Sequence, residues 1–235
     1  MRKISWYFHK VFDKQVEVKD ELITWLTYAN AGMMHSGNVH CFEYAMKNLP
    51  TDDPVIEIGS FCGLSANVTG HFLKKYNRKN KIITSDKWEM ENADTEYIGN
   101  SKIRFSDYCD FVKESFKRNV KFFNESNIPY AIEVYSDDFF SLWEKKKEVS
   151  DVFGRTIQLG GGICFAYIDG NHTYEFAKRD FLNTDKYLVK GGFIFFDDTN
   201  FESPYSCAKL MKEIKRNPSY ELVMKNPNYL FRKKQ

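Results

Sequence analysis

Two apolar runs that end in acidic residues constrain the fold of this chain more than any other feature. The run ICFAYID at 163–169 ends at Asp169, and GGFIFFDD at 191–198 ends at Asp197 and Asp198. Each run is typical of a buried β-strand, and the 197 − 169 = 28 positions between their acidic ends fit one strand–helix–strand unit. Functional residues of parallel α/β sheets gather at the carboxyl ends of the strands. The sequence therefore predicts that the three aspartates meet at one edge of a sheet.

The same alternation of strand and helix extends over most of the chain. Apolar runs at 55–58, 81–86, 131–138, 163–169 and 191–198 predict strands, and helical spacing is found at about 65–76, 139–147, 173–188 and 204–216. This repetition predicts an α/β fold with a doubly wound, mostly parallel sheet. The end of the chain, YELVMKNPNYLFRKK, predicts a C-terminal antiparallel hairpin at the sheet edge.

The chain is expected to consist of one main domain with a helical extension. Residues 18–48 have the spacing of two amphipathic helices with a break near Ser36-Gly37-Asn38, so 1–50 is interpreted as an N-terminal helical extension and 51–235 as the main domain. Two connections, at about 87–130 and 145–162, exceed the usual length of βα loops. They are expected to be lid-like insertions that govern substrate choice.

Composition excludes several classes of partner. The 235 residues include 34 Lys and Arg against 32 Asp and Glu, a net charge of +2, so no overall field favours nucleic acid or an anionic membrane. No apolar run approaches the ~18 residues that a membrane-spanning helix needs. The five cysteines lie far apart, which argues against both a zinc knuckle and a disulfide framework. A cytoplasmic protein without nucleic-acid or membrane partners is expected.

A glycine-containing turn follows the first strand and predicts a ligand site. Gly59 and Gly63 flank the turn, where the absence of side chains lets backbone approach a ligand beside the amino end of a helix. The G-x-G-x-x-G fingerprint is absent, which disfavours NAD and FAD. Glu57, on the strand before the turn, is expected to accept hydrogen bonds from a ligand amine or to orient the loop through its backbone N–H groups. The alternative is a carboxylate that only caps the loop.

Two further strand ends suggest nucleoside recognition. Asp86 follows the second strand, where an acidic side chain can accept hydrogen bonds from both hydroxyls of a ribose. Ser136 and Asp137 follow the third strand and could face an adenine edge. They could equally cap the next helix.

The three aspartates suggest chemistry at the other end of the site. Converging carboxylate oxygens suit Mg²⁺, Mn²⁺ or Ca²⁺, and a bound ion could lower the pKa of a substrate hydroxyl. They could instead act as helix caps and loop anchors without a metal. His172 could serve as a general base, or it could hold the loop or contact a cofactor.

These motifs together resemble the class I S-adenosylmethionine-dependent methyltransferases, and most of all the small-molecule O-methyltransferases related to macrocin and aminocoumarin-sugar methyltransferases. The resemblance covers about residues 50–235 and rests on VIEIGSFCGLS, TSDKWE, YSDDF, YIDGNHTYE and GGFIFFDDTN. It implies a Rossmann-like seven-stranded sheet. It also implies S-adenosylmethionine as the cofactor.

The resemblance also assigns roles to individual residues. The methionine part of the cofactor would contact Glu57, Gly59, Ser60, Gly63 and Ser65; the ribose would contact Asp86, with Trp88 near it; and the adenine would lie beside Ser136 and Asp137. Members that depend on a metal bind Mg²⁺ through carboxylates that match Asp169, Asp197 and Asp198.

One departure from the family pattern concerns the base. Related sugar methyltransferases often show Asp-Gly-Asp-His, with the second Asp proposed as the base, whereas this chain has Asn171. A neutral amide cannot take a proton at physiological pH. The base would then be His172, a metal ligand or a metal-bound hydroxide.

Methyl transfer to a hydroxyl of a small molecule, such as a sugar or a secondary metabolite, is the favoured function, with Asp169, His172 and Asp197 as catalytic residues. One alternative is an inert methyltransferase-like binding protein. Another is a nucleic-acid amino-methyltransferase, although the Asn/Asp-Pro-Pro-aromatic motif of those enzymes is absent after the fourth strand. The two helices at 18–48 could cover the active site or pair with a second subunit of a homo-oligomer.

Overall fold

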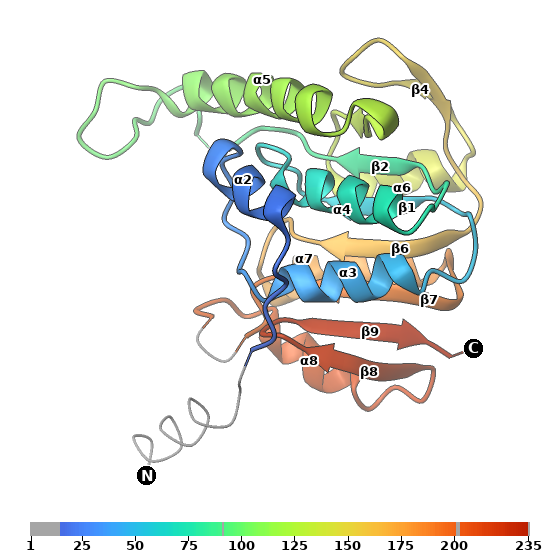
Figure 1. Ribbon diagram of the computed structural model, residues 1–235. Helices are drawn as coiled ribbons and strands as arrows, with labels where there is room; N and C mark the ends of the chain where they lie inside the picture. Colours follow the sequence, from blue (N-terminus) through green and yellow to red (C-terminus); the bar gives the residue numbers. More distant parts are fainter. Residues whose placement is uncertain (1–14, 91, 201–202, 235) are drawn as a thin grey trace.

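A seven-stranded sheet with helices on both faces forms the body of the protein (Figure 1). The computed structural model describes residues 15–90, 92–200 and 203–234. Neighbouring strands follow the order β3-β2-β1-β6-β7-β9-β8. The strands of this sheet are β1 (Val55–Ile58), β2 (Ile82–Ser85), β3 (Tyr130–Ile132), β6 (Ile163–Ile168), β7 (Leu188–Phe196), β8 (Tyr220–Lys225) and β9 (Tyr229–Lys233).

The strand directions confirm the expected doubly wound sheet. Strands β3, β2, β1, β6 and β7 pair in parallel, whereas β9 runs antiparallel to both β7 and β8. The order reverses direction between β1 and β6, and ligands of such sheets bind at this switch point. The expected C-terminal hairpin is therefore confirmed as β8 and β9.

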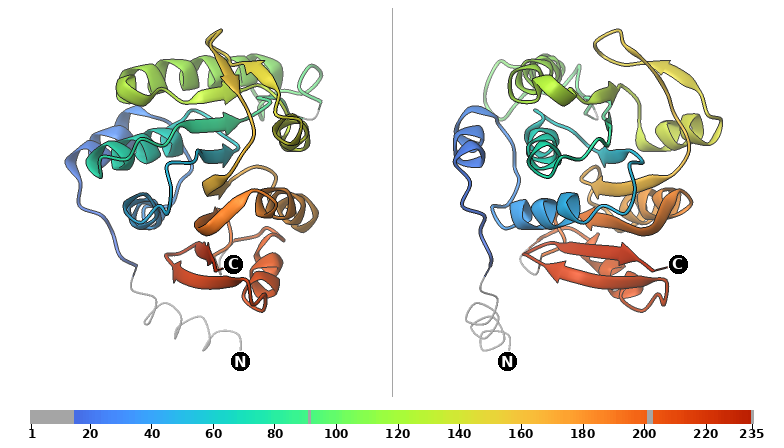
Figure 2. Two further views of the ribbon diagram at one scale, coloured as in Figure 1. Left: turned by 90° about the vertical axis from the view of Figure 1, so that its right-hand side faces the viewer. Right: turned by 45° about the vertical axis from the view of Figure 1, so that its right-hand side comes forward.

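Helices cover the two faces in separate layers (Figure 2). The layer of α3, α4 and α5, with α2 outside it, packs on one face, and α6, α7 and α8 pack on the other. Their bounds are α2 Glu21–Ala29, α3 Asn38–Lys47, α4 Leu64–Lys75, α5 Phe105–Phe123, α6 Ser136–Glu144, α7 Tyr174–Asp185 and α8 Ala208–Ile214. The two helices expected within 18–48 are thus α2 and α3. None of the described helices is long and apolar enough to cross a bilayer.

The alternation of side chains along the central strands explains both helix layers. Phe165 and Tyr167 of β6 pack under α3, whereas Ala166 and Ile168 pack under the opposite layer. Phe42 of α3 lies with its ring centroid 4.8 Å from that of Tyr167. Removal of such a buried ring typically costs about 3–5 kcal/mol of stability. Burial on both faces is what makes these strands continuously apolar in sequence.

The third strand is shorter than the sequence predicts. It ends at Ile132 rather than at Asp138, and Ser136, Asp137 and Asp138 form the first turn of α6. Short polar and acidic residues are favoured there because they interact with the unpaired N–H groups and the positive end of the helix dipole. The acidic run therefore marks a helix start, not a strand end.

Both long connections contain regular structure. The 87–130 stretch holds the 19-residue helix α5, which packs against α4 and Ala131 of β3, followed by the 3₁₀ turn η1 (Glu125–Asn127). The 145–162 stretch holds a hairpin of β4 (Glu148–Ser150) and β5 (Thr156–Gln158). Their action as lids remains a prediction.

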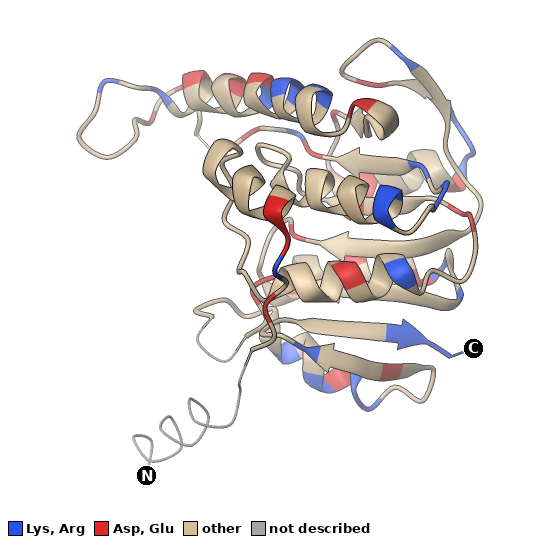
Figure 3. Cartoon of the chain, viewed as in Figure 1, with Lys and Arg blue, Asp and Glu red and all other residues tan. Residues whose placement is uncertain are grey.

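Basic residues gather at the edge of the sheet opposite the strand ends that carry the aspartates. Figure 3 shows Lys and Arg at the right-hand ends of α3, α4 and β9, and Lys47, Lys74 and Lys75 lie in the last turns of their helices. Positive charge there complements the negative end of each helix dipole.

Candidate active site

A cavity of about 1500 Å³ opens at the carboxyl ends of β1, β2, β6 and β7. Its size exceeds the 300–1,000 Å³ typical of small-molecule sites, so it has room for a cofactor and a second substrate together. Eleven of the predicted site residues line it: Gly59, Ser60, Ser65, Asp86, Trp88, Ser136, Asp137, Asp169, His172, Asp197 and Asp198. Glu57 and Gly63 lie behind its wall.

Two glycines shape the turn between β1 and α4. Gly59 and Gly63 adopt φ values of +87° and +84°, which side chains rarely allow. A Cβ atom on Gly59 would lie 2.2 Å from the backbone oxygen of Asp169, so glycine lets the loops after β1 and β6 approach each other. The turn thereby brings the start of α4 beside the end of β6.

Asp86 ties this glycine turn to the end of β2. Its Oδ2 accepts hydrogen bonds from the backbone N–H groups of Ser60, at 2.7 Å, and Phe61, at 3.0 Å. Its Oδ1 accepts from the N–H of Trp88 at 2.7 Å, and the Trp88 indole donates to the Phe61 carbonyl at 3.0 Å. The Asp86 carboxylate therefore holds the glycine turn in place, at the position where the sequence predicts an acceptor for the ribose hydroxyls.

Glu57 lies buried beneath the turn, with 4 % of its surface exposed. The Ser65 hydroxyl donates to its Oε1, whereas Oε2 has no hydrogen-bond partner among the described residues. Burial, with a smaller contribution from nearby Asp86, raises the pKa of Glu57 to about 8. An unpartnered buried carboxylate oxygen is costly, and a ligand with a positive charge would relieve that cost.

The predicted convergence of aspartates occurs at the ends of β6 and β7. Desolvation and the nearby carboxylates of Asp197 and Glu57 raise the pKa of Asp169 well above its usual range, although 29 % of its side chain remains exposed. Burial and Asp197 also raise the pKa of Asp198, and His172 opposes this effect. Asp198 adopts a φ of +50°, an uncommon value outside glycine that often marks a functional position.

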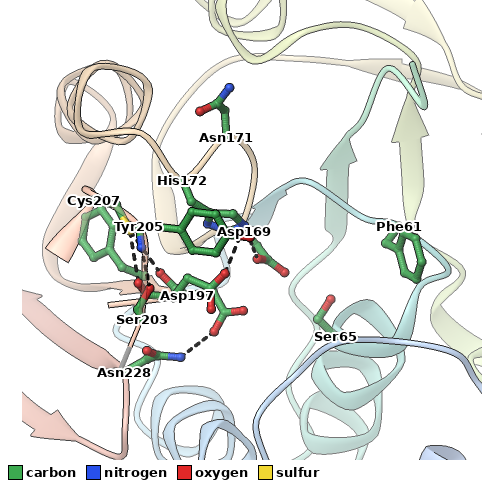
Figure 4. A network of polar contacts seen from close by, with 12 residues as sticks. Phe61, Ser65, Asp169, Asn171, His172, Asp197, Ser203, Tyr205, Cys207 and Asn228 are labelled. Carbon is green, nitrogen blue, oxygen red and sulfur yellow. Dashed lines mark hydrogen bonds and ion pairs between the residues drawn. The ribbon is translucent and has the colours of Figure 1, made fainter. Parts of the chain in front are cut away.

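His172 lies between two of these aspartates. Its Nε2 is 3.4 Å from Oδ2 of Asp198 and 3.8 Å from Oδ1 of Asp169 (Figure 4). Its ring centroid lies 4.9 Å from that of Tyr205, which forms a wall of the cavity. An imidazole in this position can take a proton and keep the resulting charge beside the Asp198 carboxylate.

Asn171 points away from the acidic cluster, as Figure 4 shows. Its exposed side chain accepts a hydrogen bond from the backbone N–H of Thr173 at 3.0 Å, and Thr173 caps the start of α7. The residue at this position thus shapes the loop that presents His172.

Asp197 is held from two directions. Its Oδ1 accepts hydrogen bonds from the amides of Asn38, on α3, and Asn228, after β8, each at 2.6 Å.

Ser136 and Asp137, at the other end of the cavity, lie in the first turn of α6, where Asp137 pairs with Arg179 at 3.2 Å.

The aspartate oxygens are of the chemical type that binds a hard divalent cation, but the side chains are not arranged as a metal site. Carboxylate oxygens are the ligands that Mg²⁺ prefers. No three His, Cys, Asp or Glu side chains in the described part of the chain come close enough to form a metal-binding group. Asp169, Asp197 and Asp198 as metal ligands therefore remain a prediction.

Some cavity residues were not identified from the sequence. Gly32, Met33 and Met34, from the segment between α2 and α3, form one wall, and Pro204 and Tyr205 form another. The helical spacing of 18–48 indicates amphipathic helices but not which loop faces the site. Asn38 and Asn228 lack a local signal because their partners lie more than 30 positions away.

A family model for a methyltransferase domain matches residues 56–199, which include β1, β2, β6 and β7 with their strand ends. The chain belongs to this methyltransferase-domain family. The resemblance stated from the sequence motifs is thereby confirmed. No curated protein matches the chain in sequence.

Solved structures share the fold of this methyltransferase-domain chain at low identity. An O-methyltransferase from Bacillus cereus in complex with SAH aligns over 99% of this chain and 97% of its own, with a TM-score of 0.59 and 12% identity. TomG, an O-methyltransferase from Streptomyces achromogenes in complex with SAM, covers 99% and 96% with a TM-score of 0.56 and 11% identity. The O-methyltransferase NovP covers 84% and 79% with a TM-score of 0.53 and 14% identity. The fold is that of class I S-adenosylmethionine-dependent methyltransferases.

Proposed function

We propose that the chain transfers the methyl group of S-adenosylmethionine to a hydroxyl of a small molecule, such as a sugar or a secondary metabolite. One observation carries the proposal: a single cavity connects the glycine turn after β1 with the His172–Asp198 pair after β6 and β7. A methyl donor and an acceptor bound at its two ends would meet between them. Positioning of this kind supplies much of the rate enhancement in bimolecular reactions.

Two buried polar atoms support S-adenosylmethionine as the donor. Glu57 Oε2 and Ser60 Oγ have no hydrogen-bond partner among the described residues, and both belong to the wall or floor of the glycine turn. The methionine part of the cofactor carries an ammonium and a carboxylate group that could satisfy such atoms. Ser65, at the start of α4, lies beside them, where the free N–H groups of the helix favour a carboxylate.

The adenosine part would extend from Asp86 toward α6. Oδ2 of Asp86 already accepts two backbone hydrogen bonds, whereas Oδ1 accepts one and keeps a lone pair for a ribose hydroxyl. Ser136 and Asp137 would flank the adenine, and Trp88 would lie near the ribose.

The acceptor would bind between His172, Tyr205 and the aspartates. S-adenosylmethionine, when bound, supplies an electrophilic methyl group on a sulfonium. His172 Nε2 takes the proton of the acceptor hydroxyl as its oxygen forms the new O–CH₃ bond; the C–S bond breaks with its electron pair on sulfur. Asp198 stabilises the imidazolium, which then loses its proton to solvent.

Two measurements test this function. Titration calorimetry should detect binding of both S-adenosylmethionine and S-adenosylhomocysteine. Mass spectrometry should then detect S-adenosylhomocysteine and a methylated product with at least one member of a panel of sugars, phenols and other hydroxylated compounds. Binding without methylated product across the panel would favour an inert binding protein, and absence of binding would refute the proposal.

A further inference from the structure

The turn between β8 and β9 contains two asparagines with different partners: one binds the N-terminal segment, and the other binds a residue of the cavity. Asn226 holds the N-terminal segment: its Nδ2 donates to the carbonyls of Val16, at 2.7 Å, and Gly37, at 2.9 Å, and its Oδ1 accepts from the Val16 N–H at 3.0 Å. Two positions later, Asn228 turns toward the cavity. This Asn-Pro-Asn turn was interpreted from the sequence only as a connection between strands.

Asn228 and Asn38 form one hydrogen-bonded unit with Asp197. Both amides donate to the same Asp197 oxygen, Oδ1, at 2.6 Å, and Asn228 also donates to Asn38 Oδ1 at 3.1 Å. Oδ1 of Asn228 accepts from the N–H of Thr199 at 2.9 Å, which fixes the orientation of its amide. The exposed fractions of Asn38, Asn228 and Asp197 are 0 %, 1 % and 6 %.

The chemistry of these donors suits the orientation of a charged group. Amides are neutral, so they fix the carboxylate without cancelling its charge as a lysine or arginine would. Hydrogen bonds to a buried carboxylate are strong, and a carboxylate that loses them either reorients or bears the cost of an unmet partner. Asp197 lines the cavity beside Asp169 and Asp198, so its orientation decides what the acceptor end presents.

We propose that Asn38 and Asn228 are positioning residues that fix Asp197 for methyl transfer. The expected effect on kcat rests on the proposed function, whereas the expected effect on the position of Asp197 does not. The proposal means that helix α3 of the N-terminal extension and the C-terminal hairpin both complete the active site.

The test compares Ala and Asp variants at both positions with a matched control. Asn38→Asp and Asn228→Asp keep the side-chain shape but lose the donor, whereas the Ala variants lose both. The control is Asn80→Ala: Asn80 is equally buried, and its amide donates to the carbonyls of Thr51, at 2.9 Å, and Asp53, at 2.6 Å, away from the cavity. All variants are compared below their melting temperatures.

The expected result is a loss of kcat of up to about 100-fold in the Ala variants, and at least as much in the Asp variants, with an unchanged Kd for S-adenosylmethionine. Asn80→Ala should lose thermal stability but keep kcat. Full kcat in the Asn38 and Asn228 variants would overturn the proposal. The proposal would also be overturned if the Asn38 and Asn228 variants lost stability and cofactor affinity together and Asn80→Ala showed the same losses.

Crystal structures of Asn38→Ala and Asn228→Ala with S-adenosylhomocysteine provide a readout that needs no acceptor. The Asp197 carboxylate should be rotated or divided between two conformers relative to the parent protein. An Asp197 that keeps its position in both variants would overturn the proposal. If the parent protein methylates no acceptor, the proposed function fails, and these structures alone decide the positioning role.

Discussion

The imidazole Nε2 of His172 lies 3.4 Å from the Asp198 carboxylate, at the end of a cavity whose other end is the glycine turn. At Asn171, where the Asp-Gly-Asp-His pattern has its second Asp, the side chain accepts a hydrogen bond from its own loop. Under the proposed function, His172 is the group that takes the proton.

Replacement of His172 by Asn should lower turnover about 10²- to 10⁴-fold, the usual contribution of a general base. Cofactor affinity should not change, because His172 lies at the acceptor end. His71→Asn is the matched control and should retain most of the activity, because His71 pairs with Asp20 and does not line the cavity. Steady-state kinetics over pH check this, and an acidic limb of the profile that persists in His172→Asn would assign the proton to another group.

Replacement of Asp86 by Asn should weaken binding of S-adenosylmethionine, because the carboxylate holds the glycine turn and is proposed to accept from the ribose. The two effects can be separated with S-adenosylhomocysteine and its 2′-deoxy analogue. If Asp86 binds the 2′-hydroxyl, calorimetry should show a smaller loss for the deoxy compound. Equal losses of affinity for both compounds would mean that Asp86 only holds the glycine turn and does not bind the ribose. The exposed Asp110→Asn variant is the control for the loss of one negative charge.

Glu57 should make stability depend on pH. Its pKa in the folded protein is about 8, against 4.5 ordinarily, so between these values the folded state holds a proton that the unfolded state has lost. Stability from this group is therefore full below pH 4.5 and is lost as pH rises toward 8, by at most about 1.4 kcal/mol per pH unit.

Glu57→Gln stays neutral and should become progressively more stable than the parent protein from pH 5 to pH 8. Thermal unfolding across this range measures the difference, with the exposed Glu148→Gln as control. Parallel curves for Glu57→Gln and the parent would show that Glu57 is ionised in the folded state.

The cavity should discriminate against anionic acceptors. Among the described residues that line it, nine are Asp or Glu and one, Lys87, is basic, although the whole chain has a net charge of +2. A phosphate group would meet an excess of acidic side chains over basic ones, and this repulsion opposes its binding. Neutral or amine-bearing acceptors should have a higher kcat/KM than their phosphorylated counterparts. Equal values would contradict this reading of the charge.

A divalent cation, if it assists, should act through the aspartates after β6 and β7. Chelator should then lower turnover, Mg²⁺ should restore it, and Asp198→Ala should remove the stimulation while cofactor affinity stays nearly intact. If a chelator does not change the turnover of the parent protein, no metal takes part, and these carboxylates act only on His172 and the acceptor.

The sequence predicted those parts of the site that follow from strand ends. Asp169, Asp197 and Asp198 meet because neighbouring parallel strands terminate at one edge, a consequence of local pattern and topology. Ser136 and Asp137 were assigned to a strand end because apolar residues continue to Val134, yet they begin α6, where Asp137 lies at the positive end of the helix dipole.

The contacts of Asn38 could not be predicted in the same way. A buried amide has no periodic pattern, and its partner Asp197 is 159 positions away. The orientation of Asn171 was likewise hidden, because the same residue type can face a substrate or cap its own loop.

The hydrogen bonds of Asn226 and Asn228 bear on how the protein could be shortened. A version trimmed at the natural-looking boundary near residue 50 would keep every strand of the sheet and the whole glycine turn. It would nevertheless lose Asn38 and both backbone partners of Asn226, so Asp197 would have one amide in place of two. It would also uncover Phe165 and Tyr167, which pack under α3, so such a fragment should fail to fold, and the first fifty residues cannot be removed as an appendage.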